Sequence, residues 1–114
     1  MDTRFEVSAL SEQLALIAIE GEIDIESAPE LSGFIEDVLT QGRSVAVSFE
    51  GCTYLDSSVI NVLVKKHKSA VGRSLRVVVV TSAGSGPRRV FDVAGLHHLM
   101  PVVATLEEAK YPAS

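Results

Sequence analysis

Apolar residues gather in three short blocks separated by more polar stretches. The blocks are Leu14–Ile19, Val45–Phe49 and Leu75–Val80, and each is almost continuously apolar. Runs of this length, rich in valine and isoleucine, are typical of strands that are buried on both faces of a sheet. We expect the first strand to end at Gly21.

Two weaker signals add strands at the edges of this sheet. Phe5–Ser8 alternates in polarity and predicts a short strand that pairs with Leu14–Ile19 through a turn at Ser11–Gln13. Val102–Val103 predicts a last, very short strand. The expected sheet therefore has four to five strands.

Helical spacing of apolar residues appears between these strands. Ser27 and Glu30 form a Ser-x-x-Glu pattern that predicts a capping box, with Pro29 in the first turn and Gly42 near the helix end. The side chains expected on its buried face are Leu31, Phe34, Ile35, Val38 and Leu39.

A second helix is expected from about Ser57 to Val71, closed by Gly72. His67 falls on its apolar side, which predicts a half-buried imidazole rather than a catalytic base. The apolar line comprises Ile60, Leu63, Val64, Ala70 and Val71, and the opposite, solvent side comprises Asn61, Lys65 and Lys68.

Two shorter helices complete the pattern. One is expected from about Pro87 to Ala94, stopped by Gly95, and a final one is capped by Thr105 and Glu108. Strands alternating with helices indicate an α/β layer sandwich on a mixed, mostly parallel sheet. We expect a single domain over residues 1–114, with its core at about 5–110.

Composition narrows the class of protein. The chain is 46% apolar and 22% charged and carries a formal charge of −5, which is typical of a soluble globular protein and argues against nucleic-acid binding. No apolar stretch approaches the ~20 residues of a membrane span. The single cysteine, Cys52, permits no internal disulfide and fits a reducing cytoplasm. We expect its side chain to be a small, half-buried apolar group.

Motifs for catalysis or cofactor binding are missing from the sequence. There is no Gly-x-Ser-x-Gly elbow and no phosphate-binding glycine loop, and the adjacent His97 and His98 have no third ligand at metal-binding spacing. We therefore expect a binding module that is not an enzyme and needs no cofactor.

The segment Leu55–Ser58 offers the best candidate site. Asp56 followed by Ser57 and Ser58 lies where the Val45–Phe49 strand has ended and a helix begins. This combination is a good helix cap, and the exposed hydroxyls beside free N–H groups also make a good place for a phosphate.

Three segments resemble STAS domains, the family of anti-sigma factor antagonists. Gly21–Leu31 resembles the strand-to-helix signature of that family, and Tyr54–Ser58 resembles its phosphorylation motif. Phe91–Leu96, with Met100–Val102 and Leu106–Ala109 behind it, resembles the C-terminal helix, last strand and closing helix. The match runs in one order from about Leu14 to Ala109. One position departs from the family, which usually has glycine where this chain has Val59.

The resemblance implies a partner-switching cycle. An unphosphorylated antagonist binds an anti-sigma factor and so frees a sigma factor. The anti-sigma factor is itself a kinase that phosphorylates a serine of the antagonist and ends the complex. A serine phosphatase then resets the cycle. Ser57 matches the phosphorylated serine, with Ser58 as the alternative. Helical periodicity places Ser58 nearer the solvent line and leaves the choice open. The resemblance also implies a cytoplasmic protein without a membrane part, as a monomer or weak dimer.

The partner-binding residues are expected around these serines. The candidates are Asp56, Ser58, Val59, Asp24, Glu22 and Asn61. Asp24 and Glu22 are expected in the loop after the first strand, on the same sheet edge as Ser57. A β-branched residue at 59 is expected to add bulk at the mouth of the helix, where it would shift partner choice or mark a homologue that binds without being phosphorylated.

Two other functions stay open at this point. A receiver domain phosphorylated on Asp56 fits the length and pattern, but no lysine follows a late strand, and Asp56 is expected seven residues beyond the end of its strand. A scaffold domain of the stressosome type would use the same fold for packing only.

Overall fold

The computed structural model describes residues 3–111 as one five-stranded sheet with helices packed on it. The strands are β1 Thr3–Ala9, β2 Leu14–Ile23, β3 Ser44–Leu55, β4 Val77–Val80 and β5 Val102–Val103. The helices are α1 Ala28–Thr40, α2 Ser57–Gly72, α3 Gly86–Val93 and α4 Leu106–Ala109, with a 3-10 turn η1 at Leu96–His98.

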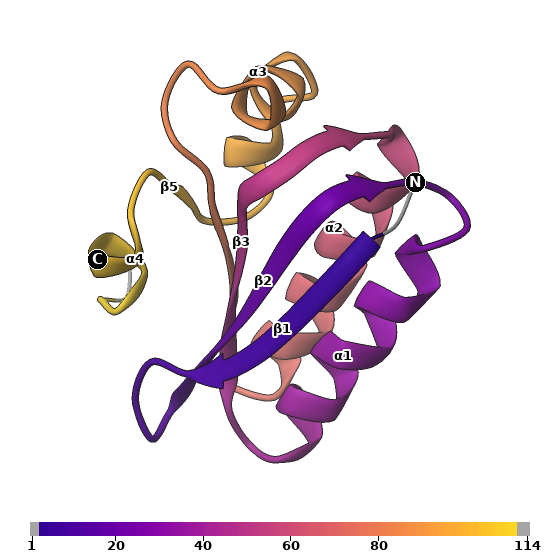
Figure 1. Ribbon diagram of the computed structural model, residues 1–114. Helices are drawn as coiled ribbons and strands as arrows, with labels where there is room; N and C mark the ends of the chain where they lie inside the picture. The colour runs from indigo at the N-terminus through magenta and orange to yellow at the C-terminus, as the bar shows by residue number, and fades with distance from the viewer. Residues whose placement is uncertain (1–2, 112–114) are drawn as a thin grey trace.

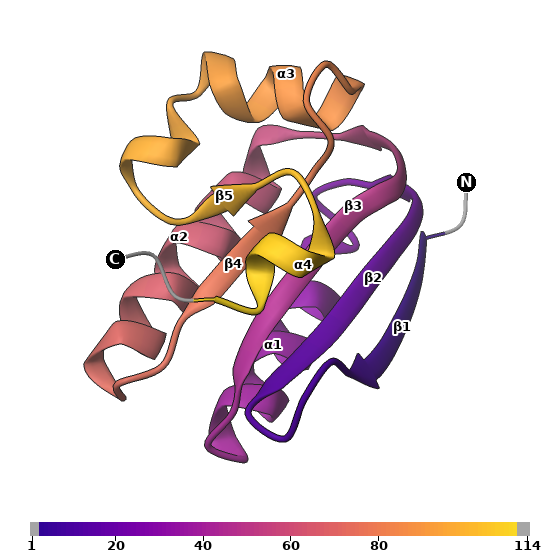
Figure 2. The same cartoon turned by 90° about the vertical axis from the view of Figure 1, so that its left-hand side faces the viewer.

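The order of the strands in the sheet is also their order in the chain. β1 pairs antiparallel with β2, and β2 to β5 are parallel neighbours. Figures 1 and 2 show α1 and α2 on one face of the sheet, α4 on the other and α3 above the upper end of the strands. The α/β fold with a mixed, mostly parallel sheet is confirmed, as is the antiparallel edge strand.

Most of the core lies between the sheet and the α1–α2 layer. A smaller apolar cluster on the opposite face lies under α4. The largest side chains of the main core that are fully buried are Phe49, Phe91, Ile17, Ile19, Ile23, Leu31, Ile35, Leu63 and Leu96. Phe91 of α3 packs edge-on against Phe49 of β3, with ring centroids 4.9 Å apart, and so ties α3 to the end of the sheet.

β2 and β3 both run further than the sequence predicts. β2 continues through Gly21, whose φ is +86°, and reaches Ile23, and β3 continues from Phe49 to Leu55. The extensions are polar or glycine-rich in sequence, and they pair with each other across two register shifts. Ile23 therefore lies opposite Leu55, and the two chain segments leave the sheet side by side.

The buried face of α2 differs from the predicted line. Val59, Leu63 and Ala70 are buried, whereas Val71 is 58% exposed. Ile60 and Val64 are only partly buried against the core. The expected solvent side is confirmed, because Asn61, Lys65 and Lys68 are all exposed.

The predicted half-buried imidazole of His67 is confirmed, whereas Cys52 is buried more deeply than the half-buried state that the sequence predicts. Half-buried His67 of α2 accepts a hydrogen bond at Nδ1 from the Val77 N–H of β4 at 3.2 Å, and burial lowers its pKa. Cys52 is 6% exposed, and burial raises the pKa of its thiol. Within residues 3–111 no helix has both the length and the apolar character to cross a bilayer.

Candidate functional site

The candidate site forms where β2 and β3 end. Because these strands are parallel, their carboxyl ends open on one edge of the sheet. The loop Asp24–Ser27 leaves β2 toward α1, and Asp56 leaves β3 to begin α2. The expectation that Asp24, Glu22 and Ser57 share an edge is thereby confirmed.

Asp56 holds the two connections together. It is the N-cap of α2, with an extended backbone, and its Oδ1 accepts hydrogen bonds from the Ser58 N–H at 2.9 Å and from the Ser58 hydroxyl. Its Oδ2 accepts the N–H of Ile25 at 3.1 Å. Both carboxylate oxygens are therefore engaged, one with the helix and one with the β2–α1 loop.

The two serines of the motif differ in their surroundings. Ser57 is exposed, and its hydroxyl makes no hydrogen bond within residues 3–111. Ser58 is half-buried, with its hydroxyl donated to Asp56. The periodicity argument that put Ser58 nearer solvent is wrong, because Asp56 draws the Ser58 side chain back over the first turn.

Asp24 organises a turn of its own. Its Oδ1 accepts the N–H groups of Glu26 at 2.9 Å and Ser27 at 3.1 Å, and the Ser27 hydroxyl accepts the N–H of Asp24 at 2.9 Å. The hydrogen bonds that the carboxylate accepts, first from the Ser27 N–H and then from the Glu26 N–H, hold the pKa of the Asp24 carboxyl below its usual range. The predicted capping box is wrong, since Ser27 occupies the N-cap position of α1 but makes no side-chain cap bond, its hydroxyl being turned toward Asp24.

The other predicted partner contacts divide into surface and core. Asn61 is exposed on α2, and Glu22 is half-buried within β2 rather than in the loop where it was expected. Val59 is a clear correction: it is fully buried, so its side chain contacts the core and cannot meet a partner. Val59 directly follows Ser58 in α2, and at this position the helix directs its side chain toward the sheet.

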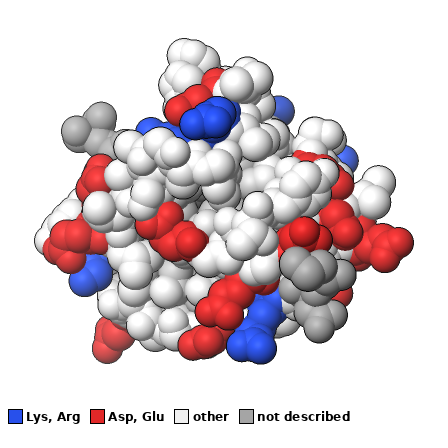
Figure 3. All heavy atoms as spheres, turned by 45° about the horizontal axis from the view of Figure 1, so that its top comes forward, with Lys and Arg blue, Asp and Glu red and all other residues white. Residues whose placement is uncertain are grey.

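The edge that carries Ser57 is acidic. Figure 3 turns this end of the molecule forward and shows many acidic side chains with few basic ones among them. The acids at the ends of β2 and β3 and in the following connections are Glu20, Glu22, Asp24, Glu26, Glu50 and Asp56. Within residues 3–111 only Glu20 among them has an ion pair, with Arg4 at 3.7 Å. A phosphate on Ser57 would add charge to a surface that is already negative.

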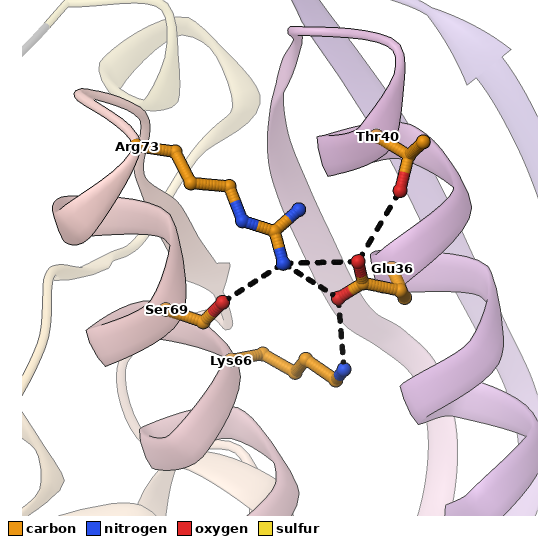
Figure 4. Close-up of polar contacts among 5 residues, drawn as sticks. All are labelled: Glu36, Thr40, Lys66, Ser69 and Arg73. Atoms are coloured by element: carbon orange, nitrogen blue, oxygen red, sulfur yellow. Dashed lines mark hydrogen bonds and ion pairs between the residues drawn. The ribbon is translucent and has the colours of Figure 1, made fainter.

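A groove of about 540 Å³ begins beside this edge and runs between α1 and α2. Its lining residues are Ile25, Ala28, Pro29, Ser32, Ser58, Asn61, Val62, Lys65, Lys66 and Ser69. Near its far end Glu36 of α1 joins the two helices, as Figure 4 shows, by pairing with Lys66 at 3.1 Å and Arg73 at 2.9 Å. Thr40 and Ser69 complete this polar cluster through Glu36 and Arg73 respectively.

The Glu36 cluster makes stability depend on pH in acid. Hydrogen bonds from Lys66 and Arg73 lower the pKa of the Glu36 carboxyl from 4.5 to about 2, so the folded state favours the charged form. Its contribution is complete above about pH 4.5 and is lost as the pH falls toward 2. We expect urea unfolding to show Glu36→Gln less stable than the parent protein at pH 7, with the difference shrinking below pH 4.5. A difference independent of pH would contradict this assignment.

The geometry also corrects one argument against a receiver domain. Because β3 extends to Leu55, Asp56 follows its strand directly instead of seven residues later. Its carboxylate is nevertheless occupied on both oxygens by the cap and the Ile25 N–H. No group of three or more His, Cys, Asp or Glu side chains in the described part of the chain is arranged to hold a metal ion.

Sequence reasoning missed the groove, the exposed Ile25 and the Glu36 cluster. Ile25 is 70% exposed on a hydrogen-bonded turn, and an apolar residue in a loop is a signal that the sequence did carry. Glu36 lies 30 and 37 residues from its two partners, so no local pattern marks it.

Comparisons with known proteins agree on the fold. A model of the family described as "Mlab, STAS domain" matches residues 7–104. A search of curated proteins finds no match. An anti-sigma factor antagonist from Mycobacterium paratuberculosis superposes with a TM-score of 0.83 at 21% identity, covering 96% of this chain and 92% of its own.

Two further solved structures are similar. The phosphorylated form of the Bacillus cell fate determinant SpoIIAA gives a TM-score of 0.69 at 24% identity, covering 94% of this chain and 96% of its own. An anti-sigma-factor antagonist domain protein from Planctomyces limnophilus gives 0.75 at 19% identity, covering 92% and 93%. At these identities the likeness establishes a shared fold.

Proposed function

The chain belongs to the STAS domain family, and on that premise we propose that it is an anti-sigma factor antagonist switched by phosphorylation of Ser57. Unphosphorylated, it binds an anti-sigma factor and so releases a sigma factor. The anti-sigma factor is also a serine kinase that ends the complex by phosphorylating Ser57, and a serine phosphatase restores binding. The protein itself is a binding partner without catalysis.

The observation that carries this proposal is the different state of the two serines. Ser57 is exposed with an unengaged hydroxyl, whereas the Ser58 hydroxyl is held by Asp56. A kinase must reach the acceptor oxygen and align it in line with the γ-phosphate of ATP. Ser57 meets that requirement without breaking any hydrogen bond of its side chain.

Phosphoryl transfer at Ser57 balances with the kinase as the source of ATP. The Ser57 Oγ forms a bond to the γ-phosphorus, the bond from that phosphorus to the β–γ bridging oxygen breaks, and ADP leaves. The hydroxyl proton passes to a base of the kinase. Phosphoserine then carries about −1.5 to −2 charges at neutral pH.

The added charge acts on the interface more than on the fold. A negative group at the N-terminus of α2 is favourable by about 0.3–1 kcal/mol. At an interface the same group would be desolvated beside Asp56 and the acidic residues of this edge, of which only Glu20 is paired with a cation within residues 3–111. The switch therefore requires no change of conformation in this chain.

Mixing the protein with the anti-sigma kinase encoded nearest to its gene, ATP and Mg²⁺ tests the proposal. We expect one phosphate, located on Ser57 by mass spectrometry and stable to acid, because phosphoserine survives acid whereas aspartyl and histidyl phosphates hydrolyse. Label on Ser58 alone would keep the function and move the site. An acid-labile phosphate on Asp56 would support a receiver domain instead.

A complex that forms with this kinase but never yields phosphate would contradict the switch. If that complex also tolerated every substitution at Ser57 and Ser58, the scaffold function would explain the protein better. Binding and phosphorylation are thus measured in the same mixture and separate the two functions.

A further inference from the structure

We propose that the groove between α1 and α2 binds an amphipathic helix of the partner protein that carries a cluster of carboxylates. The groove starts at Ile25 and Ser58 and ends at Ser69, and its lining has an apolar part and a basic part. The inference rests on the proposed function only in assuming that this chain acts by binding another protein. It adds the chemistry of the segment that is bound.

The basic part comes from α2, which has no acidic residue. Lys65 and Lys68 are exposed, and neither forms an ion pair within residues 3–111. Lys66 and Arg73 share the single carboxylate of Glu36. This surplus of positive charge stands on one helix of a chain whose formal net charge is −5, and two of the four cations, Lys65 and Lys66, line the groove.

The apolar part comes from the loop before α1 and from the first turns of both helices. Ile25 is 70% exposed, yet its N–H is bonded to Asp56 and the Asp24 turn fixes the loop around it. Pro29 and Val62 continue the apolar lining. An exposed branched side chain on a rigid loop loses little freedom on binding, which makes it an effective anchor.

Length and polarity favour a helical occupant in one orientation. Ser58 and Ser69 are eleven residues apart on α2, about 16 Å along its axis, which matches three turns of a docked helix. Asp24, Glu26 and Asp56 lie at the Ile25 end, whereas the lysines lie toward the other. The carboxylates of the bound helix therefore belong beside Lys65, and its apolar residues beside Ile25 and Val62. An extended nucleic-acid backbone fits less well, because the carboxylates at one end repel phosphate.

Selection from a phage-displayed library of random peptides of about 16 residues, long enough for four helical turns, tests the groove with the full chain as bait. We expect the enriched peptides to contain more Asp and Glu than the library, with apolar residues at spacings of three and four. In fluorescence anisotropy, Lys65→Glu is expected to weaken a selected peptide about tenfold or more, and added salt to weaken it further.

Lys110→Glu is the matched control, because Lys110 is an exposed lysine at the end of α4, on the other face of the sheet. It makes the same change in net charge and is expected to leave peptide binding unchanged. Lack of enrichment, peptides without an acidic bias, equal effects of the two variants, or displacement of the peptide by single-stranded DNA would each overturn the proposal.

The outcome is independent of the phosphorylation switch. No kinase or anti-sigma factor enters the selection. If the groove binds no such peptide, phosphorylation of Ser57 by the kinase still tests the proposed function. Conversely, acidic peptides that bind a chain never phosphorylated by the kinase would support the groove and contradict the switch.

Discussion

Replacing Ser57 by aspartate is expected to weaken binding to the anti-sigma factor about a hundredfold, equivalent to about 3 kcal/mol. The same substitution should change the free energy of unfolding by less than about 1 kcal/mol, because a carboxylate is favourable at the first turn of α2. The asymmetry arises from desolvation. In the free protein the new charge stays in water, whereas in the complex it is buried against a surface that fits a neutral hydroxyl.

Two variants at the same position separate charge from shape. Ser57→Asn has nearly the size of aspartate without its charge and is expected to bind much more tightly than Ser57→Asp. Ser57→Ala is expected to bind like the parent protein and to resist the kinase, which traps the complex with the anti-sigma factor. Titration calorimetry measures binding, and thermal unfolding verifies that each variant is folded.

Unchanged binding of Ser57→Asp, or unfolding of that variant, would locate the switch elsewhere. Equal losses for Ser57→Asn and Ser57→Asp would show that shape rather than charge controls the interface. The acidic surroundings sharpen this comparison, because within residues 3–111 only Glu20 on this edge is paired with a cation.

The centre of the sheet could be predicted because its signal is local. Val77–Val80 is buried on both faces and apolar throughout, so the run itself predicts the strand. The second half of β3, Glu50–Leu55, carries no such signal: its polar and glycine residues are extended because they pair with the end of β2. That pairing brings Asp56 and Ile25 together. It joins segments that are distant in the sequence, so no local pattern predicts it.

Local patterns failed where two side chains competed for the same backbone groups. Ser27 and Glu30 match a capping box, but the Asp24 carboxylate is nearer and takes the Ser27 N–H, while the Ser27 hydroxyl turns back to the Asp24 N–H. Counting helical turns predicts Ser58 on the solvent side, but the hydrogen bond from its hydroxyl to Asp56 draws the side chain back toward the cap. Counting assumes a regular helix, and the first turn of a helix is shaped by its cap.

The burial of Val59 was the least predictable feature of the site. The STAS pattern usually has glycine there, which suggested an open surface, yet the valine side chain is fully buried among core residues. Valine in this chain therefore fills a part of the core beneath the serine pair. It supports the first turn of α2 from below and leaves the outer surface to Ser57 and Asn61.

Val59→Gly, which restores the family residue, is accordingly expected to destabilise this chain. Losing a fully buried valine costs about 1.5–3 kcal/mol, and glycine in a helix adds several tenths more, so we expect about 3 kcal/mol and a decrease in Tm of about 10 °C. Val71→Gly is the control: it makes the same change in the same helix where the side chain is 58% exposed, and it should cost less than about 1 kcal/mol. Urea unfolding of both variants measures the difference, and binding per folded molecule should be unchanged in each. Equal costs for the two variants would mean that Val59 does not pack into the core, and weaker binding by folded Val59→Gly would return this residue to the interface.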